Sequence, residues 1–133
     1  MADQLTLNVP GKAEYVGTVR MTVAHVASSA GFDIEAIDDI KVAVSEACTN
    51  IILHAHKDAV FNYDVLVERG DNNLTITVED NGAGFGLEDY IPPVPGETQG
   101  SGLGIFIIRA LMDEVDIQTE TGAGTRILMS KNL

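Results

Sequence analysis

The sequence has one cysteine, few basic residues and no long apolar run, and each shortage excludes a class of protein. Cys48 has no second cysteine to pair with, so an internal disulfide is excluded and a reducing compartment suits the chain. No stretch approaches the roughly 20 apolar residues that a membrane-spanning helix needs. The N-terminal residues have neither a basic nor an apolar region, so we expect no secretory signal. These shortages predict a cytoplasmic protein without a membrane segment.

Basic side chains are also scarce relative to acidic ones. Eight Lys and Arg residues face 20 Asp and Glu residues, which gives a formal net charge of -12 at pH 7. Broad electrostatic contact with nucleic acid is therefore disfavoured. A small anionic ligand would need backbone N–H groups and a metal ion to supply positive potential. The acidic surface suits a basic protein partner, and equally it can serve only to keep the protein soluble.

The length and the apolar content predict one domain with a buried core. The chain has 133 residues, of which 45% are hydrophobic. The spacing of apolar and turn residues predicts a strand at 4–9, helices at 15–30 and 34–56, strands at 61–68 and 74–79, a helix from about 102 to 114, and strands at 115–121 and 125–130. Gly31 should end the first helix, and Asp33 should cap the second. Strands joined by tight hairpins predict an α/β fold, a two-layer sandwich with helices on one face of a mixed, mostly antiparallel sheet.

Three segments carry residue types that suit a nucleotide site, and the first lies on the second predicted helix. Glu46 and Asn50 are four residues apart, so their side chains stack on one helical face. The amide oxygen of Asn50 could bind Mg²⁺, a hard cation that prefers oxygen ligands. Glu46 could accept a proton from an attacking hydroxyl or water. Taken alone, the pair is more typical of an ordinary solvated helix face.

The second segment follows the strand at 74–79. Asp80, at the strand end, could accept a hydrogen bond from the exocyclic amino group of adenine. Gly82 and Gly84 would let the backbone pass close to the ring, although an Asn-Gly pair more commonly marks a simple tight turn. Thr125, at the start of the last predicted strand, could add a hydroxyl group to the same pocket. The strand propensity of threonine explains that residue equally well.

The third segment opens the third predicted helix and is rich in glycine. It comprises Gly100, Ser101, Gly102, Leu103 and Gly104. Glycines at a helix N-terminus free N–H donors for an anion, and the helix dipole favours negative charge there. The segment is not a Walker A loop, because no Lys-Ser or Lys-Thr follows it, and it does not fit the dinucleotide-binding pattern. A flexible hinge is the alternative interpretation.

Other catalytic readings are weaker. Cys48 falls on the apolar side of its predicted helix, which favours a packed thiol over a reactive one. His54 and His56 are two residues apart, so they do not share a helical face, and the sequence has no HExxH motif.

In this order, the three segments resemble the N box and two glycine boxes of the ATPase and kinase superfamily of DNA gyrase B, Hsp90, histidine kinases and MutL. More narrowly, residues 42–50, 14–17 and 111–115 resemble the bacterial anti-sigma factor serine/threonine-protein kinases of the RsbW and SpoIIAB group. The resemblance covers nearly the whole chain. It implies a single histidine-kinase-like ATPase domain over 1–133, with a Bergerat ATP-binding fold and a mobile lid at about 86–99.

The resemblance also implies roles for individual residues. Glu46 would be the general base, Asn50 the Mg²⁺ ligand and Asp80 the adenine contact, with Thr125 near the base. The remaining ATP-binding residues would be Gly82, Gly84, Gly100, Ser101, Gly102, Leu103 and Gly104.

The activity implied is phosphoryl transfer from ATP to a Ser or Thr of an anti-anti-sigma protein of the STAS type. The family also implies sequestration of a sigma factor by a homodimer that does not itself bind nucleic acid, in stress response or sporulation. However, no Lys or Arg occurs between Arg69 and Arg109 to contact the γ-phosphate. A nucleotide-regulated binding module with little or no kinase activity is therefore the main alternative. A histidine-kinase fragment and a kinase of a stressosome-like pathway are the others.

Overall fold

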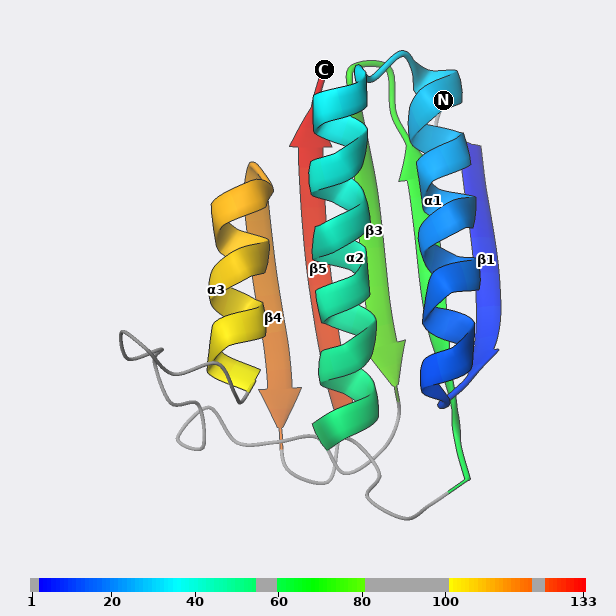
Figure 1. The fold of residues 1–133 in the computed structure, drawn as a ribbon, viewed down its shortest axis with the longest axis vertical. Helices are drawn as coiled ribbons and strands as arrows, with labels where there is room; N and C mark the ends of the chain where they lie inside the picture. Colours follow the sequence, from blue (N-terminus) through cyan, green and yellow to red (C-terminus); the bar gives the residue numbers. More distant parts are fainter. Residues whose placement is uncertain (1–2, 55–59, 81–100, 121–123) are drawn as a thin grey trace.

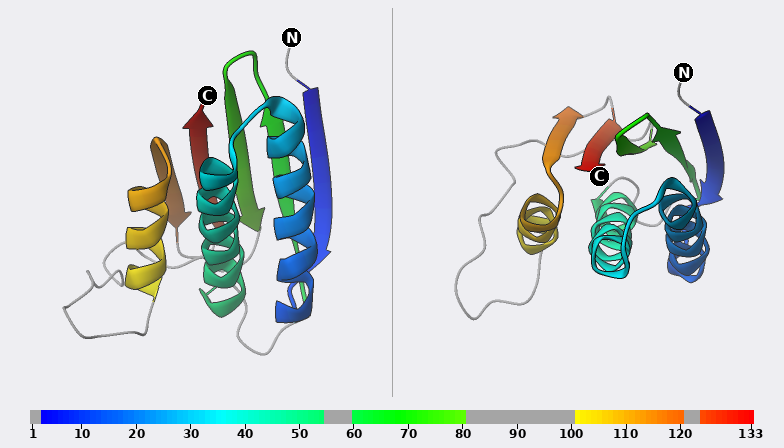
Figure 2. Two further views of the ribbon diagram at one scale, coloured as in Figure 1. Left: turned by 45° about the horizontal axis from the view of Figure 1, so that its top comes forward. Right: turned by 90° about the horizontal axis from the view of Figure 1, so that it is seen from above.

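The computed structural model describes residues 3–54, 60–80, 101–120 and 124–133, which form a layer of helices on one face of a five-stranded sheet (Figure 1). Viewed from above, α1, α2 and α3 all lie on the same side of the strands (Figure 2). The elements in chain order are β1 (Asp3–Pro10), the short 3-10 helix η1 (Ala13–Tyr15), α1 (Val16–Ala30), α2 (Ile34–His54), β2 (Asn62–Arg69), β3 (Asn73–Asp80), α3 (Ser101–Leu111), β4 (Glu114–Glu120) and β5 (Gly124–Asn132). The predicted two-layer α/β sandwich is confirmed.

The strands lie in the order β1-β2-β3-β5-β4. All four pairings between the described strands are antiparallel. We expected a mixed, mostly antiparallel sheet, and the described strands include no parallel pair. β1 and β4 lie at the two edges of the sheet. The hairpin between β2 and β3 closes where the turn residues predicted. There the Gly70 N–H donates a hydrogen bond of 3.0 Å to the Asn73 carbonyl.

The helices begin and end largely where the sequence indicated. α1 stops at Gly31, whose positive φ of 100° is a conformation that glycine adopts without steric cost. Asp33 caps α2, because its Oδ1 accepts a hydrogen bond of 2.8 Å from the Ala36 N–H. The described part of α2 ends at His54, and residues 55–59 lie outside the described residues. No described helix is long and apolar enough to cross a membrane.

The core lies between the helices and the sheet. Each helix turns one apolar stripe inward, and each strand contributes alternate side chains to the same layer. The fully buried apolar residues include Val19, Val23 and Ala27 of α1, Ile40, Val44, Ala47 and Cys48 of α2, and Val65, Val67, Ile76, Val78, Ile127 and Met129 of the sheet. Burying one such Val, Ile or Met side chain contributes about 1.5–3 kcal/mol. Cys48 is packed, as its place on the apolar side of α2 predicted.

The third helix is shorter than the sequence suggested. We expected it to extend to about residue 114, but α3 ends at Leu111 and Glu114 already begins β4. The chain leaves the helix because Asp113 bonds to β5: its N–H donates to the Ser130 carbonyl at 2.9 Å, and its Oδ2 accepts from the Asn132 N–H at 2.7 Å. These partners are distant in sequence, so local helix propensity gives no sign of them.

Candidate active site

Two of the three predicted segments meet where α2 packs against α3. A methyl group at position 104 would lie only 2.9 Å from Oε2 of Glu46, which is closer than normal packing allows. Gly104 therefore leaves room for the Glu46 carboxylate beside the helix backbone. Glu46 itself is half-buried, so a substrate group can still reach it. The candidate base of the first segment thus contacts the glycine segment directly.

Asn50 lies one turn further along α2 and is almost completely buried, with 3% of its surface exposed. Neither the nitrogen nor the oxygen of its side-chain amide has a hydrogen-bond partner among the residues that the structure describes. Leaving a buried polar group without a partner costs about 1–3 kcal/mol. A ligand that bonds to this amide would remove that cost, and its oxygen is the ligand type that Mg²⁺ prefers. The buried amide therefore fits the metal-binding role expected for Asn50.

The adenine candidates come together on the neighbouring strands β3 and β5. Asp80 and Thr125 are directly opposite each other in the antiparallel ladder, and both are buried, with 5% and 3% exposure. They share the sheet face of Val78 and Ile127, which packs against the helices. The Thr125 hydroxyl also lies 3.1 Å from the Thr119 hydroxyl on β4. A carboxylate and a hydroxyl group are thus adjacent under the helix layer.

These groups gather at one end of the molecule. The C-terminal ends of α2 and β3, the start of β5 and the N-terminal end of α3 all lie at the lower end in Figure 1. Ser101, Gly102, Leu103 and Gly104 form the first turn of α3, where backbone N–H groups lack helical acceptors and the dipole favours an anion. Gly82, Gly84, Gly100 and the predicted lid at 86–99 lie outside the described residues.

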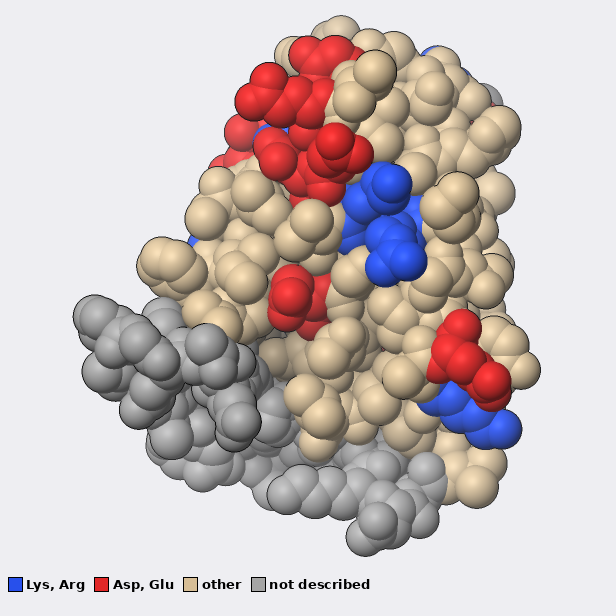
Figure 3. All heavy atoms as spheres, in the orientation of Figure 1, with Lys and Arg blue, Asp and Glu red and all other residues tan. Residues whose placement is uncertain are grey.

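A groove on the outer surface of the helices is lined by Glu46 and by two basic residues. It has a volume of about 390 Å³, and Glu46 lines it together with Arg20, Asp38, Lys41, Val42 and Ser45. The Arg20 guanidinium donates a hydrogen bond of 3.3 Å to Ser45 Oγ, which joins α1 to α2 beside the base. Near the centre of this molecular face, Lys and Arg side chains form a small basic area between acidic side chains (Figure 3).

Sequence reasoning missed both cations of the groove. It considered only the segment between Arg69 and Arg109, which contains no basic residue. Lys41 precedes Glu46 by five residues on the same helix, a spacing that does not place two side chains on one helical face, so helical geometry did not indicate it. Arg20 belongs to a different helix, and nothing in the local sequence predicts its position.

Known proteins resemble the chain in both sequence and fold. The sequence profile of the histidine kinase-like ATPase domain matches residues 9–131. Proteins named serine-protein kinase RsbW from Bacillus thuringiensis (strain Al Hakam) and Bacillus anthracis are 38% identical to it, over 97% of this chain and 84% of theirs.

Solved structures extend the likeness at the level of the fold. The RsbU and RsbW domains of a Mycobacterium tuberculosis protein superpose with a TM-score of 0.74 and 22% identity, over 98% of this chain and 32% of that longer chain. The histidine kinase domain of a blue-light activated histidine kinase from Erythrobacter litoralis gives a TM-score of 0.62 and 23% identity, over 91% of this chain and 60% of that chain. The chain therefore belongs to the histidine kinase-like ATPase domain family, within its RsbW group of serine-protein kinases.

Proposed function

We propose that the protein is a cytoplasmic anti-sigma factor that uses Mg-ATP to phosphorylate a Ser or Thr of an anti-anti-sigma antagonist. One observation carries the catalytic part of this proposal: the Glu46 carboxylate lies against Gly104, at the first turn of the helix that would face the phosphates. A base and an anion-binding helix end are thereby adjacent, as transfer to a hydroxyl group requires. The names of the relatives support a serine as the acceptor.

Each group of residues in the candidate site would have its own role in the transfer. A hydroxyl group that enters the outer groove meets Glu46, which accepts its proton on a carboxylate oxygen. Arg20 and Lys41 line the same groove and would hold an acidic neighbour of that hydroxyl group in place. The N–H groups at the start of α3 would orient the phosphates by hydrogen bonding. Asp80 and Thr125 would select adenine from the sheet side.

Asn50 would be the protein ligand for Mg²⁺, since its buried amide has no partner among the described residues. Mg²⁺ commonly takes only one or two protein ligands and completes its octahedron with waters and phosphate oxygens. When bound, Mg-ATP supplies the phosphoryl group and the positive charge that stabilises its transfer. Asn50 and the start of α3 would fix the position of that group relative to Glu46.

The proposed function also includes binding of a sigma factor and assembly into a homodimer. Both are features implied by the RsbW resemblance, and the acidic surface of the chain suits a basic partner segment. Sedimentation of the protein alone and with a sigma factor would measure both properties.

A second candidate function is a nucleotide-regulated binding module with little kinase activity. The absence of Lys and Arg between Arg69 and Arg109 favours it, because transfer is usually assisted by a cation near the γ-phosphate. Arg20 and Lys41, which line the same groove as Glu46, weigh against it.

A transfer assay separates the candidates. The protein is incubated with labelled Mg-ATP and a candidate anti-anti-sigma antagonist, and the labelled residue is identified. We expect acid-stable phosphoserine or phosphothreonine on the antagonist at many turnovers per protein. Acid-labile phosphohistidine would instead identify a histidine-kinase fragment. Tight sigma-factor capture without measurable transfer would identify the binding module.

A further inference from the structure

Helix α3 packs along α2, and its inner side chains Ile105 and Ile108 are buried in the core. Its position along α2 therefore decides where Gly104 meets Glu46. At the active-site end, a methyl group at position 104 would fit only if the Glu46 carboxylate moved away. The opposite end of α3 lies far from the site, and a side chain of β5 holds it.

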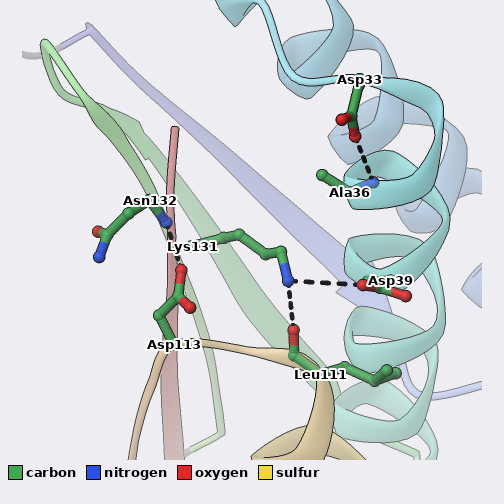
Figure 4. Close-up of polar contacts among 7 residues, drawn as sticks. All are labelled: Asp33, Ala36, Asp39, Leu111, Asp113, Lys131 and Asn132. Carbon is green, nitrogen blue, oxygen red and sulfur yellow. Dashed lines mark hydrogen bonds and ion pairs between the residues drawn. The ribbon is translucent and has the colours of Figure 1, made fainter.

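That side chain is Lys131. Its ammonium group donates a hydrogen bond of 2.6 Å to the carbonyl of Leu111, the last residue of α3. The same group lies 3.5 Å from Oδ2 of Asp39 on α2 (Figure 4). Lys131 is mostly buried, with 15% of its side chain exposed, so water screens these contacts less than it would on the surface. A cation at this end also complements the helix dipole.

The two contacts are equally spaced on both helices. Asp39 and Glu46 are seven residues apart on α2, and Gly104 and Leu111 are seven residues apart on α3. Seven residues are two turns and about 10 Å, so each helix presents both contacts on the same side. The helices run in opposite directions in Figure 1, which matches Asp39 with Leu111 and Glu46 with Gly104. Lys131 thus bridges Asp39 and Leu111, the pair that lies away from the active site.

We propose that Lys131 is a positioning residue, which sets the register of α3 against α2 and thereby holds Glu46 against Gly104. It does not touch the substrate groups itself. This role deepens the proposed function, because misplacing a base or a phosphate-binding helix end by about 1 Å can reduce the transfer rate by up to about a hundredfold. A lysine that only stabilised the fold would leave the active-site contact unchanged in the folded protein.

The contact can be measured without any kinase assay. In the protein with Lys131, the substitution Glu46→Gln should move the backbone amide resonance of Gly104 in a nitrogen–proton NMR spectrum, because the two groups are adjacent. The same substitution is then made together with Lys131→Met, which keeps the apolar stem and removes the charge. We expect the response of Gly104 to fall by at least about half. Lys131→Arg should restore it, because arginine can donate to both acceptors.

Two further variants serve as a control and as a second test of the Lys131 contacts. Lys12→Met removes an exposed lysine far from α3 and should leave the Gly104 response unchanged. Asp39→Asn removes only the ion-pair partner, is milder than the loss of Lys131, and should reduce the response in the same direction. If Lys131→Met does not fold, the Gly104 response in Asp39→Asn tests the proposal in its place.

Turnover provides the second readout. At saturating ATP and well below the unfolding temperature, Lys131→Met should lower the transfer rate about tenfold, whereas Lys12→Met should not. An unchanged Gly104 response in folded Lys131→Met would overturn the proposal, whatever its thermal stability. If the response falls but the parent protein shows no transfer, the positioning role stands and the proposed kinase activity fails.

Discussion

The Glu46 carboxylate on α2 lies so close to Gly104 on α3 that a methyl group at position 104 would come to 2.9 Å from its Oε2 atom. Two segments separated by more than 50 residues thereby form one surface, on which the candidate base adjoins a helix N-terminus. The absence of a side chain at position 104 is what permits the contact. The chemistry of the site therefore depends on backbone packing as well as on the charged residue.

Adding that methyl group should separate stability from activity. In Gly104→Ala, the flexible end of Glu46 can move away, so the strain is small, and alanine is up to about 1 kcal/mol better than glycine inside a helix. We expect a melting temperature that is unchanged or raised. The displaced base should lower transfer about tenfold or more, with nucleotide affinity much less affected. Transfer at the parent rate would show that the contact does not position the base.

Replacing the buried Asn50 should also have opposite effects on the free and the bound protein. Asn50→Leu is similar in shape and removes an amide that has no hydrogen-bond partner among the described residues. We expect the ligand-free protein to gain up to about 1–3 kcal/mol in its free energy of unfolding. The additional stabilisation by Mg²⁺ together with nucleotide should disappear. Denaturant unfolding with and without Mg-ADP measures both. A variant that loses stability and keeps the metal-dependent gain would contradict the assignment.

The base specificity should depend on Asp80. Asp80→Asn replaces a group that only accepts hydrogen bonds with one that can also donate, so a 6-oxo purine becomes acceptable. We expect the preference for ATP over GTP to fall at least about tenfold in competition binding. Thr125→Val, which removes the hydroxyl group opposite Asp80, is the matched control and should weaken binding of both nucleotides without reversing the preference.

The burial of Cys48 should affect stability at alkaline pH. Desolvation by burial raises the pKa of its thiol from 9.0 to about 11. The unfolded chain releases this proton at lower pH than the folded protein. The buried thiol therefore keeps its full contribution to the free energy of unfolding below about pH 9, and this contribution is lost as the pH rises toward 11. The loss amounts to about 2–3 kcal/mol at most. Unfolding of the parent and of Cys48→Val across this range measures the contribution of the thiol together with its effect on Tyr63, whose pKa is raised by burial and by Cys48. Parallel pH profiles would contradict the assignment.

Local patterns in the sequence identified most of the fold. Gly31 and Asp33 marked the boundary between α1 and α2, and the apolar stripe with Cys48 marked the buried face. The two hairpins were evident from their turn residues. The order of the strands was not, because turn chemistry does not say that β5, instead of β4, pairs with β3. That pairing is what sets Asp80 opposite Thr125.

The site could be predicted in its residue types but not in its contacts. Glu46 and Gly104 were both candidates, yet their packing depends on how α3 lies along α2. The early end of α3 and the bridge through Lys131 depend on contacts with β5, about 20 residues further along the chain. Arg20 reaches the groove from α1, so the local sequence around Glu46 does not reveal its position. Long-range packing accounts for each of these differences.

The most direct measurement is the transfer rate of Glu46→Gln at saturating Mg-ATP with the antagonist present, alongside its nucleotide affinity. Glutamine keeps the size and the polar contacts of the side chain but cannot accept the proton. We expect a loss of about a hundredfold or more in the transfer rate, with nucleotide affinity within about twofold of the parent. Phosphorylation of the antagonist at the parent rate by Glu46→Gln would contradict the central claim that Glu46 is the general base.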